Sequence, residues 1–91
     1  MKFIWDEVKR KSNLAKHGLD FTDVRAVFAG ATFTFEDDRF DYGEQRFVTL
    51  GLLKGMAVVI AHTERDDTVR IVSMRKATRH EQKTYFHQFT H

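Results

Sequence analysis

Cysteine and proline are absent from this 91-residue chain, and glycine occurs only five times. The absence of cysteine excludes disulfides and thiolate metal sites, and it is typical of a cytosolic protein. No apolar run approaches the roughly 20 residues of a membrane-spanning helix, and the first residues show no signal-peptide pattern. We therefore expect a cytoplasmic protein that does not bind a membrane.

Hydrophobic residues, by contrast, are plentiful enough for a folded globule. They make up 42% of the chain and include nine phenylalanines, unlike the composition of a disordered protein. The length suits one domain over residues 1–91 with a single modest core. Such a core leaves little room for a buried organic cofactor, so we expect no cofactor.

Charge is unevenly distributed, although the net charge is only +2. Cations exceed acids from Lys2 to Gly18 and from Arg70 to Lys83, whereas acids exceed cations from Asp20 to Glu44. This pattern predicts a dipolar surface that binds a polyanion on one side and a basic partner on the other. A solvated surface without a partner explains the same pattern equally well.

Periodicity and end signals predict an α+β fold with two N-terminal helices, an antiparallel sheet of about four strands and one C-terminal helix. Short links between the later strands force antiparallel neighbours. Thr78 and Glu81 form a capping box at the start of the last helix. The expected elements are a strand or extended segment at Lys2–Trp5, a helix from the Asp6 N-cap to His17 with Gly18 at its end, a short helix capped by Asp20 or Thr22 and ended by Gly30, strands at Thr32–Glu36, Gln45–Leu52, Met56–Thr63 and Val69–Arg75, and a helix from Thr78 to Phe89, with an acidic loop at Glu36–Glu44.

The two hairpins of the second half also predict a register. If both links are symmetric, Arg46 faces His62 and His62 faces Arg70, which makes a row across the core face of the sheet. Arg75 then lies on the other face, beside two small residues. A bulge in either hairpin would change this arrangement.

This predicted row has the chemistry for cutting RNA. Two neighbouring arginines disfavour the charged form of His62, so a neutral imidazole is ready to accept a proton. Cleavage of RNA without metal needs a base for the 2′-hydroxyl, cations for the phosphorane and an acid for the leaving oxygen. The plainer interpretation, which these residues alone favour, makes His62 a structural residue and pairs the arginines with acids of the loop.

Other basic and polar residues are candidates for RNA contact. Lys9, Asn13 and His17 share one face of the first predicted helix, because offsets of four and seven residues return to the same side. Lys76 and Arg79 belong to the basic stretch between the last strand and the last helix. An ordinary exposed helix face is the plainer interpretation of the first group.

No metal site is expected. His80, His87 and His91 lie near one another in the sequence, but no carboxylate or thiolate completes a ligand set with them. A glycine-rich phosphate loop, a Ser/His/Asp set and paired catalytic carboxylates are also missing from the sequence.

Two stretches of this sequence resemble a known family. The opening contains Phe3-Ile4-Trp5-Asp6, Lys9, Asn13, Lys16-His17-Gly18 and Phe21. The closing part contains Thr63-Glu64-Arg65, Arg70-Ile71-Val72-Ser73-Met74-Arg75-Lys76-Ala77, Glu81 and Tyr85. Together, in this order and over this length, they resemble the BrnT family of type II toxins. Met74 replaces an alanine that many members carry, which is a conservative departure.

The resemblance implies a RelE-like ribonuclease fold and a bacterial toxin that arrests growth by cutting RNA. It implies a BrnA-type antitoxin as partner, with operator DNA bound only through that antitoxin, and it leaves a homodimer open. RelE-like nucleases often use Arg, Lys and Tyr for catalysis. The catalytic candidates are therefore Arg46, His62, Arg70, Arg75 and Tyr85, and the candidates for RNA binding are Lys9, Asn13, His17, Arg65, Lys76 and Arg79.

Two functions of different classes fit the sequence. The first is a metal-independent endoribonuclease. The second is a module that binds nucleic acid or protein without catalysis, of which an inactive relative that only binds the antitoxin would be a special case. Cleavage that is lost on substitution of a site residue separates the two, whereas salt-sensitive RNA binding is expected of both.

Overall fold

The computed structural model describes residues 1–39, 41 and 43–89. They form three α-helices, one short 3₁₀ helix and five strands. The elements are β1 (Lys2–Trp5), α1 (Glu7–His17), the 3₁₀ helix η1 (Phe21–Asp23), α2 (Val24–Ala29), β2 (Phe33–Asp37), β3 (Arg46–Leu53), β4 (Met56–Arg65), β5 (Thr68–Lys76) and α3 (Arg79–Phe89). The predicted α+β class is confirmed.

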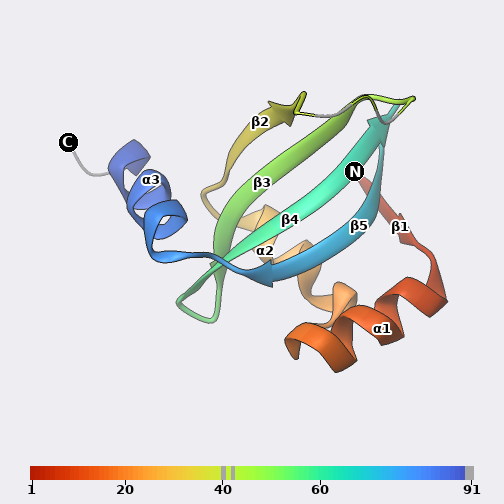
Figure 1. The fold of residues 1–91 in the computed structure, drawn as a ribbon, viewed down its shortest axis with the longest axis horizontal. Helices are drawn as coiled ribbons and strands as arrows, with labels where there is room; N and C mark the ends of the chain where they lie inside the picture. The colour runs from red at the N-terminus through yellow and green to blue at the C-terminus, as the bar shows by residue number, and fades with distance from the viewer. Residues whose placement is uncertain (40, 42, 90–91) are drawn as a thin grey trace.

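The five strands make one mixed sheet in the order β1-β5-β4-β3-β2. The pairs β2–β3, β3–β4 and β4–β5 are antiparallel, whereas the pair β1–β5 is parallel. The expected strand or extended segment at Lys2–Trp5 is confirmed as β1, but the prediction of about four antiparallel strands did not place it in the sheet as a fifth, parallel strand at one edge (Figure 1). A strand of four residues leaves little local signal, and its partner lies at the other end of the sequence.

The larger core lies on the side of the sheet that the helices α1 and α2 occupy (Figure 1), and its helical side chains come from η1 and α2. We call this side the α1–α2 face. Phe21, Val27 and Ile60 are completely buried there. The cluster also contains Leu19, Val24, Leu53, Val58, Val69, Ile71 and Met74.

The opposite side of the sheet, the α3 face, is only partly covered. At the end where β5 stops, Tyr85 of α3 packs with Leu50, Ala57 and Val59 in a second, smaller cluster. The helix α3 stands at this end of the sheet (Figure 1). The described helices leave the rest of the α3 face uncovered (Figure 1).

The hairpin turns are shorter than predicted. Residues 54–55 join β3 to β4, and residues 66–67 join β4 to β5. Lys54 and Gly55 both have positive φ, 51° and 80°, as in the mirror-image turns that two-residue hairpins prefer. Phe47 therefore faces His62 on one side and Ile71 faces it on the other.

The predicted row of Arg46, His62 and Arg70 is consequently wrong. A symmetric link of three or five residues was assumed, and the shorter turns shift each neighbour by one position. In addition, β5 has a bulge: Ala61 pairs with Ser73 but His62 pairs with Ile71, which leaves Val72 without a partner. A shift of one residue moves side chains to the opposite face.

Local end signals, in contrast, were predicted correctly. Asp6 accepts hydrogen bonds from the backbone of Val8 and Lys9 at the start of α1, and Gly18 ends that helix in the left-handed conformation with φ 69°. The capping box of α3 is present in both directions. The Thr78 amide donates to Glu81 at 2.9 Å, and the Glu81 amide donates to Thr78 Oγ1 at 3.2 Å.

One glycine lets α2 approach the sheet. A Cβ on Gly51 of β3 would lie 2.6 Å from Cγ1 of Val27, a completely buried and stiff side chain. We predict that Gly51→Ala lowers the free energy of unfolding by about 1–3 kcal/mol through overpacking, as measured by urea denaturation. Gly30→Ala is the control, because the nearest atom to its new Cβ is 3.7 Å away. Equal stability of the two variants would contradict this close packing.

Candidate functional site

The α3 face gathers the arginines that the sequence singles out. Arg70 pairs with Thr63 across β5 and β4. Arg46 begins β3 one residue before the Phe47–His62 pair, so the same register continued by one step sets it beside Thr63. A row of Arg46, Thr63 and Arg70 therefore crosses the α3 face, with a threonine where the prediction had His62. We call it the arginine row.

Arg75 lies on the same face because of the β5 bulge. Side chains alternate along a regular strand, so residues five positions apart would point to opposite sides. The unpaired Val72 adds one step between Arg70 and Arg75 and brings both to the α3 face. At about 3.3 Å per residue they are roughly 15 Å apart, too far to hold one phosphate together.

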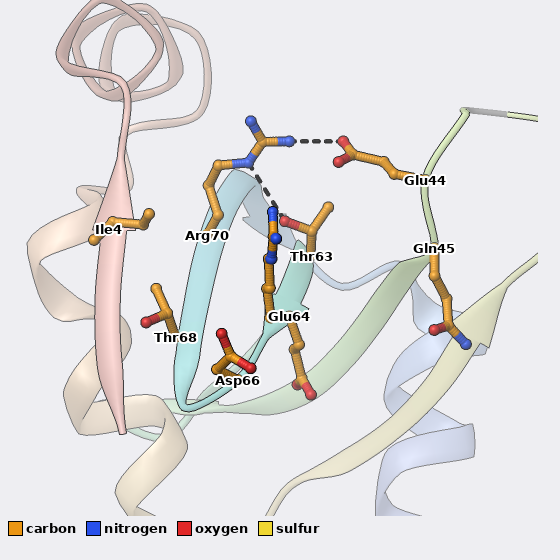
Figure 2. Close-up of a pocket in the computed structure, with 9 residues that line it drawn as sticks. Ile4, Glu44, Gln45, Thr63, Glu64, Asp66, Thr68 and Arg70 are labelled. Carbon is orange, nitrogen blue, oxygen red and sulfur yellow. Dashed lines mark hydrogen bonds and ion pairs between the residues drawn. The ribbon is translucent and has the colours of Figure 1, made fainter.

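Arg70 has an exposed guanidinium at the edge of a hollow of about 580 Å³. Its Nη2 donates to Glu44 at 2.6 Å, and its Nε lies 3.4 Å from the hydroxyl of Thr63 (Figure 2). Both side chains of this ion pair are nearly half exposed, at 47% and 45%. Exposed ion pairs contribute only about 0–1 kcal/mol, so an anionic ligand can replace Glu44 at little cost. Arg65 lines the same hollow.

Arg75 forms an ion pair with Glu81 at the start of α3. Its two terminal nitrogens donate to the two oxygens of Glu81 at 2.8 and 2.9 Å. These hydrogen bonds, followed by the backbone amide of Thr78, lower the pKa of Glu81 to about 2, and the carboxylate raises the pKa of Arg75. Arg75 thus ties the end of β5 to α3 while it faces the open part of the sheet.

His62 lies in the core and not on the open face. Its side chain is completely buried on the α1–α2 face, stacked on Phe47 at 5.9 Å and edge-on to Phe28 at 5.5 Å. Burial lowers its pKa to about 4. The sequence predicted a neutral imidazole for a different reason, repulsion by two arginines. Contact between His62 and a bound RNA would require this core to open.

A chain of polar groups leads from His62 to the edge of the sheet. Its Nε2 is 2.7 Å from the hydroxyl of Thr49, which is 2.7 Å from the hydroxyl of Thr34 on β2. The other ring nitrogen, Nδ1, has no hydrogen-bond partner among the described residues. The nearest carboxylate, Glu64, is 3.6 Å away. This half-satisfied imidazole is a structural group whose protonation would disturb the core.

Tyr85 is also a packing residue. Only 3% of it is exposed, and its hydroxyl donates to the carbonyl of Ala31 at 2.8 Å. The ring contacts Phe86 and Phe89 of the same helix. The phenol therefore anchors α3 to the segment before β2 and does not face the arginine row.

Asn13 has a structural role that the sequence did not indicate. Its Nδ2 donates to the carbonyls of Leu19 and Met74, at 3.1 and 2.8 Å, and its Oδ1 accepts the amide of Met74 at 3.1 Å. β1 pairs with β5 only as far as Ile71. The side-chain amide thus takes the place of a strand along the rest of that edge.

This contact sets the orientation of α1. Asn13 is the buried residue of the helix, whereas Val8 is 77% exposed. The plainer interpretation of Lys9, Asn13 and His17 as an ordinary exposed face is therefore wrong for Asn13. Lys9 and His17 flank Asn13 in a shallow hollow between α1 and β5 that lies apart from the arginine row.

The remaining RNA-binding candidates are spread over the surface. Lys76 pairs with Val58, a residue of the larger core, and so leaves β5 on the opposite side from Arg75. Arg79 is exposed in the first turn of α3. Within the described residues no group of three or more His, Cys, Asp or Glu could hold a metal ion, and His91 lies outside them.

Sequence reasoning did not select Thr63, Glu44 or Phe35 as site residues. Thr63 lies between two arginines only because of the register, and Glu44 approaches Arg70 only in the folded chain. Phe35 had a local signal, since its alternation with Phe33 placed both aromatic rings on one face. Its 44% exposure shows that this face is not fully packed.

The fold and the site together define a small α+β domain with its main core on one face of the sheet and arginines gathered on the other. A family model described as the ribonuclease toxin BrnT of type II toxin–antitoxin systems matches residues 5–81. The chain belongs to this BrnT family, as its motifs predicted. A protein antitoxin is the partner that such a family implies. No curated protein matches the chain.

The matched range contains Arg46, Arg70 and Arg75 but ends before Tyr85. None of the helices in the described part of the chain is both long and apolar enough to cross a membrane.

Asn13 should matter for stability. We predict that Asn13→Ala lowers the free energy of unfolding by about 3 kcal/mol, because it leaves the buried amide and carbonyl of Met74 without partners. Lys9→Ala, an exposed change on the same helix, should alter it by less than about 0.5 kcal/mol. Urea denaturation of both variants is the measurement, and an Asn13 variant as stable as the wild type would refute the structural role.

His62 should make the fold sensitive to acid. Its pKa of about 4 in the folded chain is below its ordinary 6.5, so the unfolded chain binds the proton more tightly between these pH values. The full stability is present above pH 6.5 and falls as the pH decreases towards 4. From about pH 7.5 to about pH 5 this amounts to about 2 kcal/mol.

Urea denaturation at these two pH values tests the assignment. His62→Gln should lose less stability on acidification than the wild type, by about 2 kcal/mol. His80→Gln, on the exposed first turn of α3, is the control and should follow the wild type. If all three proteins lost the same stability, acid sensitivity could not be assigned to His62.

Proposed function

We propose that this chain is a metal-independent endoribonuclease that cleaves single-stranded RNA on the α3 face and thereby arrests bacterial growth. The observation that carries the proposal is the gathering of Arg46, Arg65, Arg70 and Arg75 on one face of the sheet, to which the bulge in β5 adds Arg75. A polyanion is the ligand that such a face attracts. Membership of a ribonuclease toxin family supports RNA as that polyanion.

Arg46 and Arg70 hold the phosphate that is cleaved in this proposal. The 2′-oxygen attacks the adjacent phosphorus, the bond from phosphorus to the 5′-oxygen breaks, and a 2′,3′-cyclic phosphate and a 5′-hydroxyl result. The guanidinium groups donate to the phosphate oxygens, whose negative charge grows in the transition state. The 2′-hydroxyl proton passes to water, and water protonates the leaving 5′-oxygen.

Glu44 and Thr63 assist Arg70 from two sides. Thr63 lies between the two arginines and its hydroxyl is 3.4 Å from Arg70 Nε, so it fixes the direction of the guanidinium. Glu44 holds Arg70 at 2.6 Å while RNA is absent. A phosphate that replaces this carboxylate finds the arginine already extended over the sheet, which reduces the ordering cost of binding.

Arg75 has a positioning role in this proposal, because Glu81 engages both of its terminal nitrogens. Arg65, beside Arg70 in the same hollow, binds the RNA backbone. Lys9, His17, Lys76 and Arg79 add attraction at longer range. His62 and Tyr85 are not assigned to catalysis, because both are buried.

The antitoxin partner covers the α3 face in this proposal. A BrnA-type protein with an acidic segment would pair with the arginine row and exclude RNA, since the same cations serve both ligands. The complex binds operator DNA through the antitoxin. In this proposal the arginine row binds RNA when the chain is alone, which makes the chain toxic. In the complex the antitoxin occupies the same arginines and neutralises the toxin.

Cleavage of a defined RNA in EDTA tests the function. We predict that the wild type cleaves, and that Arg70→Ala lowers kcat/KM by about 100-fold, because one donor to the transition state is lost. Arg25→Ala is the matched control. Arg25 is an exposed arginine of α2 that stacks on Phe3 on the other side of the sheet, so its loss should leave cleavage unchanged.

Three outcomes would count against parts of this proposal. A folded wild type that binds RNA in a salt-dependent way but never cleaves it would be a binding module. Cleavage only after addition of a divalent metal would refute metal independence. Equal activity of the Arg70 and Arg25 variants would remove the arginine row from the active site.

A further inference from the structure

A cleft of about 390 Å³ lies next to the arginine row on the α3 face. Its floor is made by Val48, Val59, Ala61 and Ser73 of the three central strands. Phe35 of the edge strand β2 forms one wall. We call it the Phe35 cleft. Its volume is within the range of small-ligand sites, which begins at about 300 Å³.

The floor of the cleft is open because it is built from small side chains. Phe35, Val48, Ala61 and Ser73 follow one another across β2, β3, β4 and β5. Alanine and serine in the middle of a sheet leave room above them, whereas valine at the next positions keeps the floor apolar. A flat apolar group fits this shape.

Phe35 is placed as a stacking surface. Its side chain is 44% exposed although it belongs to a strand. The ring of Phe33 supports it from behind at a centroid distance of 5.7 Å. An exposed aromatic ring with a fixed neighbour offers an apolar contact at low entropic cost, and single-stranded nucleic acids bind to such rings by base stacking.

The charges around the cleft favour an uncharged occupant. Asp37 and Glu81 at the rim are each held by two hydrogen bonds from an arginine, Arg39 and Arg75 respectively. Glu36 and Asp38 line the cleft as well, so its four acids and two arginines leave a net charge of −2, which disfavours a phosphate there. A phosphate finds better partners in the arginine row, which is two residues further along the strands, or roughly 7 Å. That spacing suits the base and the phosphate of one nucleotide.

We propose that the Phe35 cleft binds one unpaired nucleobase of the RNA, stacked on Phe35, while the arginine row holds the phosphate beside it. The inference rests on the proposed function and adds a binding subsite to it. Phe35 is a positioning residue: it sets which phosphodiester lies over Arg70. Bases in a duplex are stacked and paired already, so the cleft selects single-stranded RNA.

The subsite is tested by measuring how tightly the wild type and the Phe35 variants bind RNA with and without a particular base. The probe is a short unpaired 2′-O-methyl RNA, which lacks the free 2′-hydroxyl needed for cleavage, and a series of copies each with one abasic position. Phe35→Ala should bind the intact RNA roughly tenfold more weakly than the wild type, the loss of one stacked base. Phe35→Trp should bind it as tightly as the wild type.

The abasic series supplies the decisive comparison. At one position the missing base should weaken binding to the wild type roughly tenfold but leave binding to Phe35→Ala unchanged, because the lost contact is the same. Phe86→Ala is the matched control, since Phe86 is also 44% exposed but belongs to α3. It should bind every RNA as the wild type does.

The two proposals fail in different ways. Unchanged binding of the intact RNA by Phe35→Ala, with Arg70→Ala weakened, would overturn the base subsite alone and leave the cleft to a protein partner. The base subsite would also be overturned if, at every abasic position, the loss of affinity from the missing base added to the loss from Phe35→Ala. A folded wild type that binds none of these RNAs would overturn both proposals.

Discussion

The backbone of β5 needs hydrogen-bond partners along both edges, and the rest of the structure depends on how this need is met. β4 pairs with one edge from Thr68 to Lys76 except at Val72, but β1 pairs with the other edge only from Thr68 to Ile71. Beyond the bulge, the side-chain amide of Asn13 takes over at Met74. The N-terminal strand and the first helix thus act as two successive partners of the last strand, which fixes the N-terminal segment against β5.

The bulge that separates these two partners also creates the candidate site. It changes the parity of the strand between Arg70 and Arg75, so that two arginines that a regular strand would place on opposite sides share the α3 face. The α1–α2 face keeps the apolar side chains Val58, Ile60, Ile71 and Met74 of the larger core. The bulge at Val72 therefore places both arginine side chains of β5 on the face opposite the larger core.

Much of the fold could be predicted from local sequence. Helix caps depend on hydrogen bonds within one helical turn, so the caps made by Asp6, Gly18, Thr78 and Glu81 were predicted correctly. The three later strands and the last helix also lie close to their predicted positions. The register, the bulge and the pairing of β1 depend on contacts between distant segments. The residues around Lys54 and Asp66 did not by themselves identify turns of two residues. Because the predicted register was wrong by one residue, His62 was expected at the place that Thr63 occupies.

The candidate site was predictable in its arginines but not in its acid–base groups. Arginine is rarely buried, so an accessible position could be predicted for Arg46, Arg70 and Arg75 from residue type, and their role stays a prediction. Histidine, tyrosine and asparagine serve equally well inside a protein when hydrogen-bonded. His62, Tyr85 and Asn13 do so here, and residue type alone could not reveal it.

The open end of the α3 face has a consequence for how this chain can change over generations. Phe35 and Arg70 are exposed and Thr63 is half-buried, whereas the completely buried side chains of the larger core lie on the other side. Substitutions at exposed positions usually cost little stability. In the function proposed above, the ligand preference of this surface can therefore drift while the scaffold stays folded, and a toxin and its antitoxin can diverge together into pairs that no longer recognise other pairs.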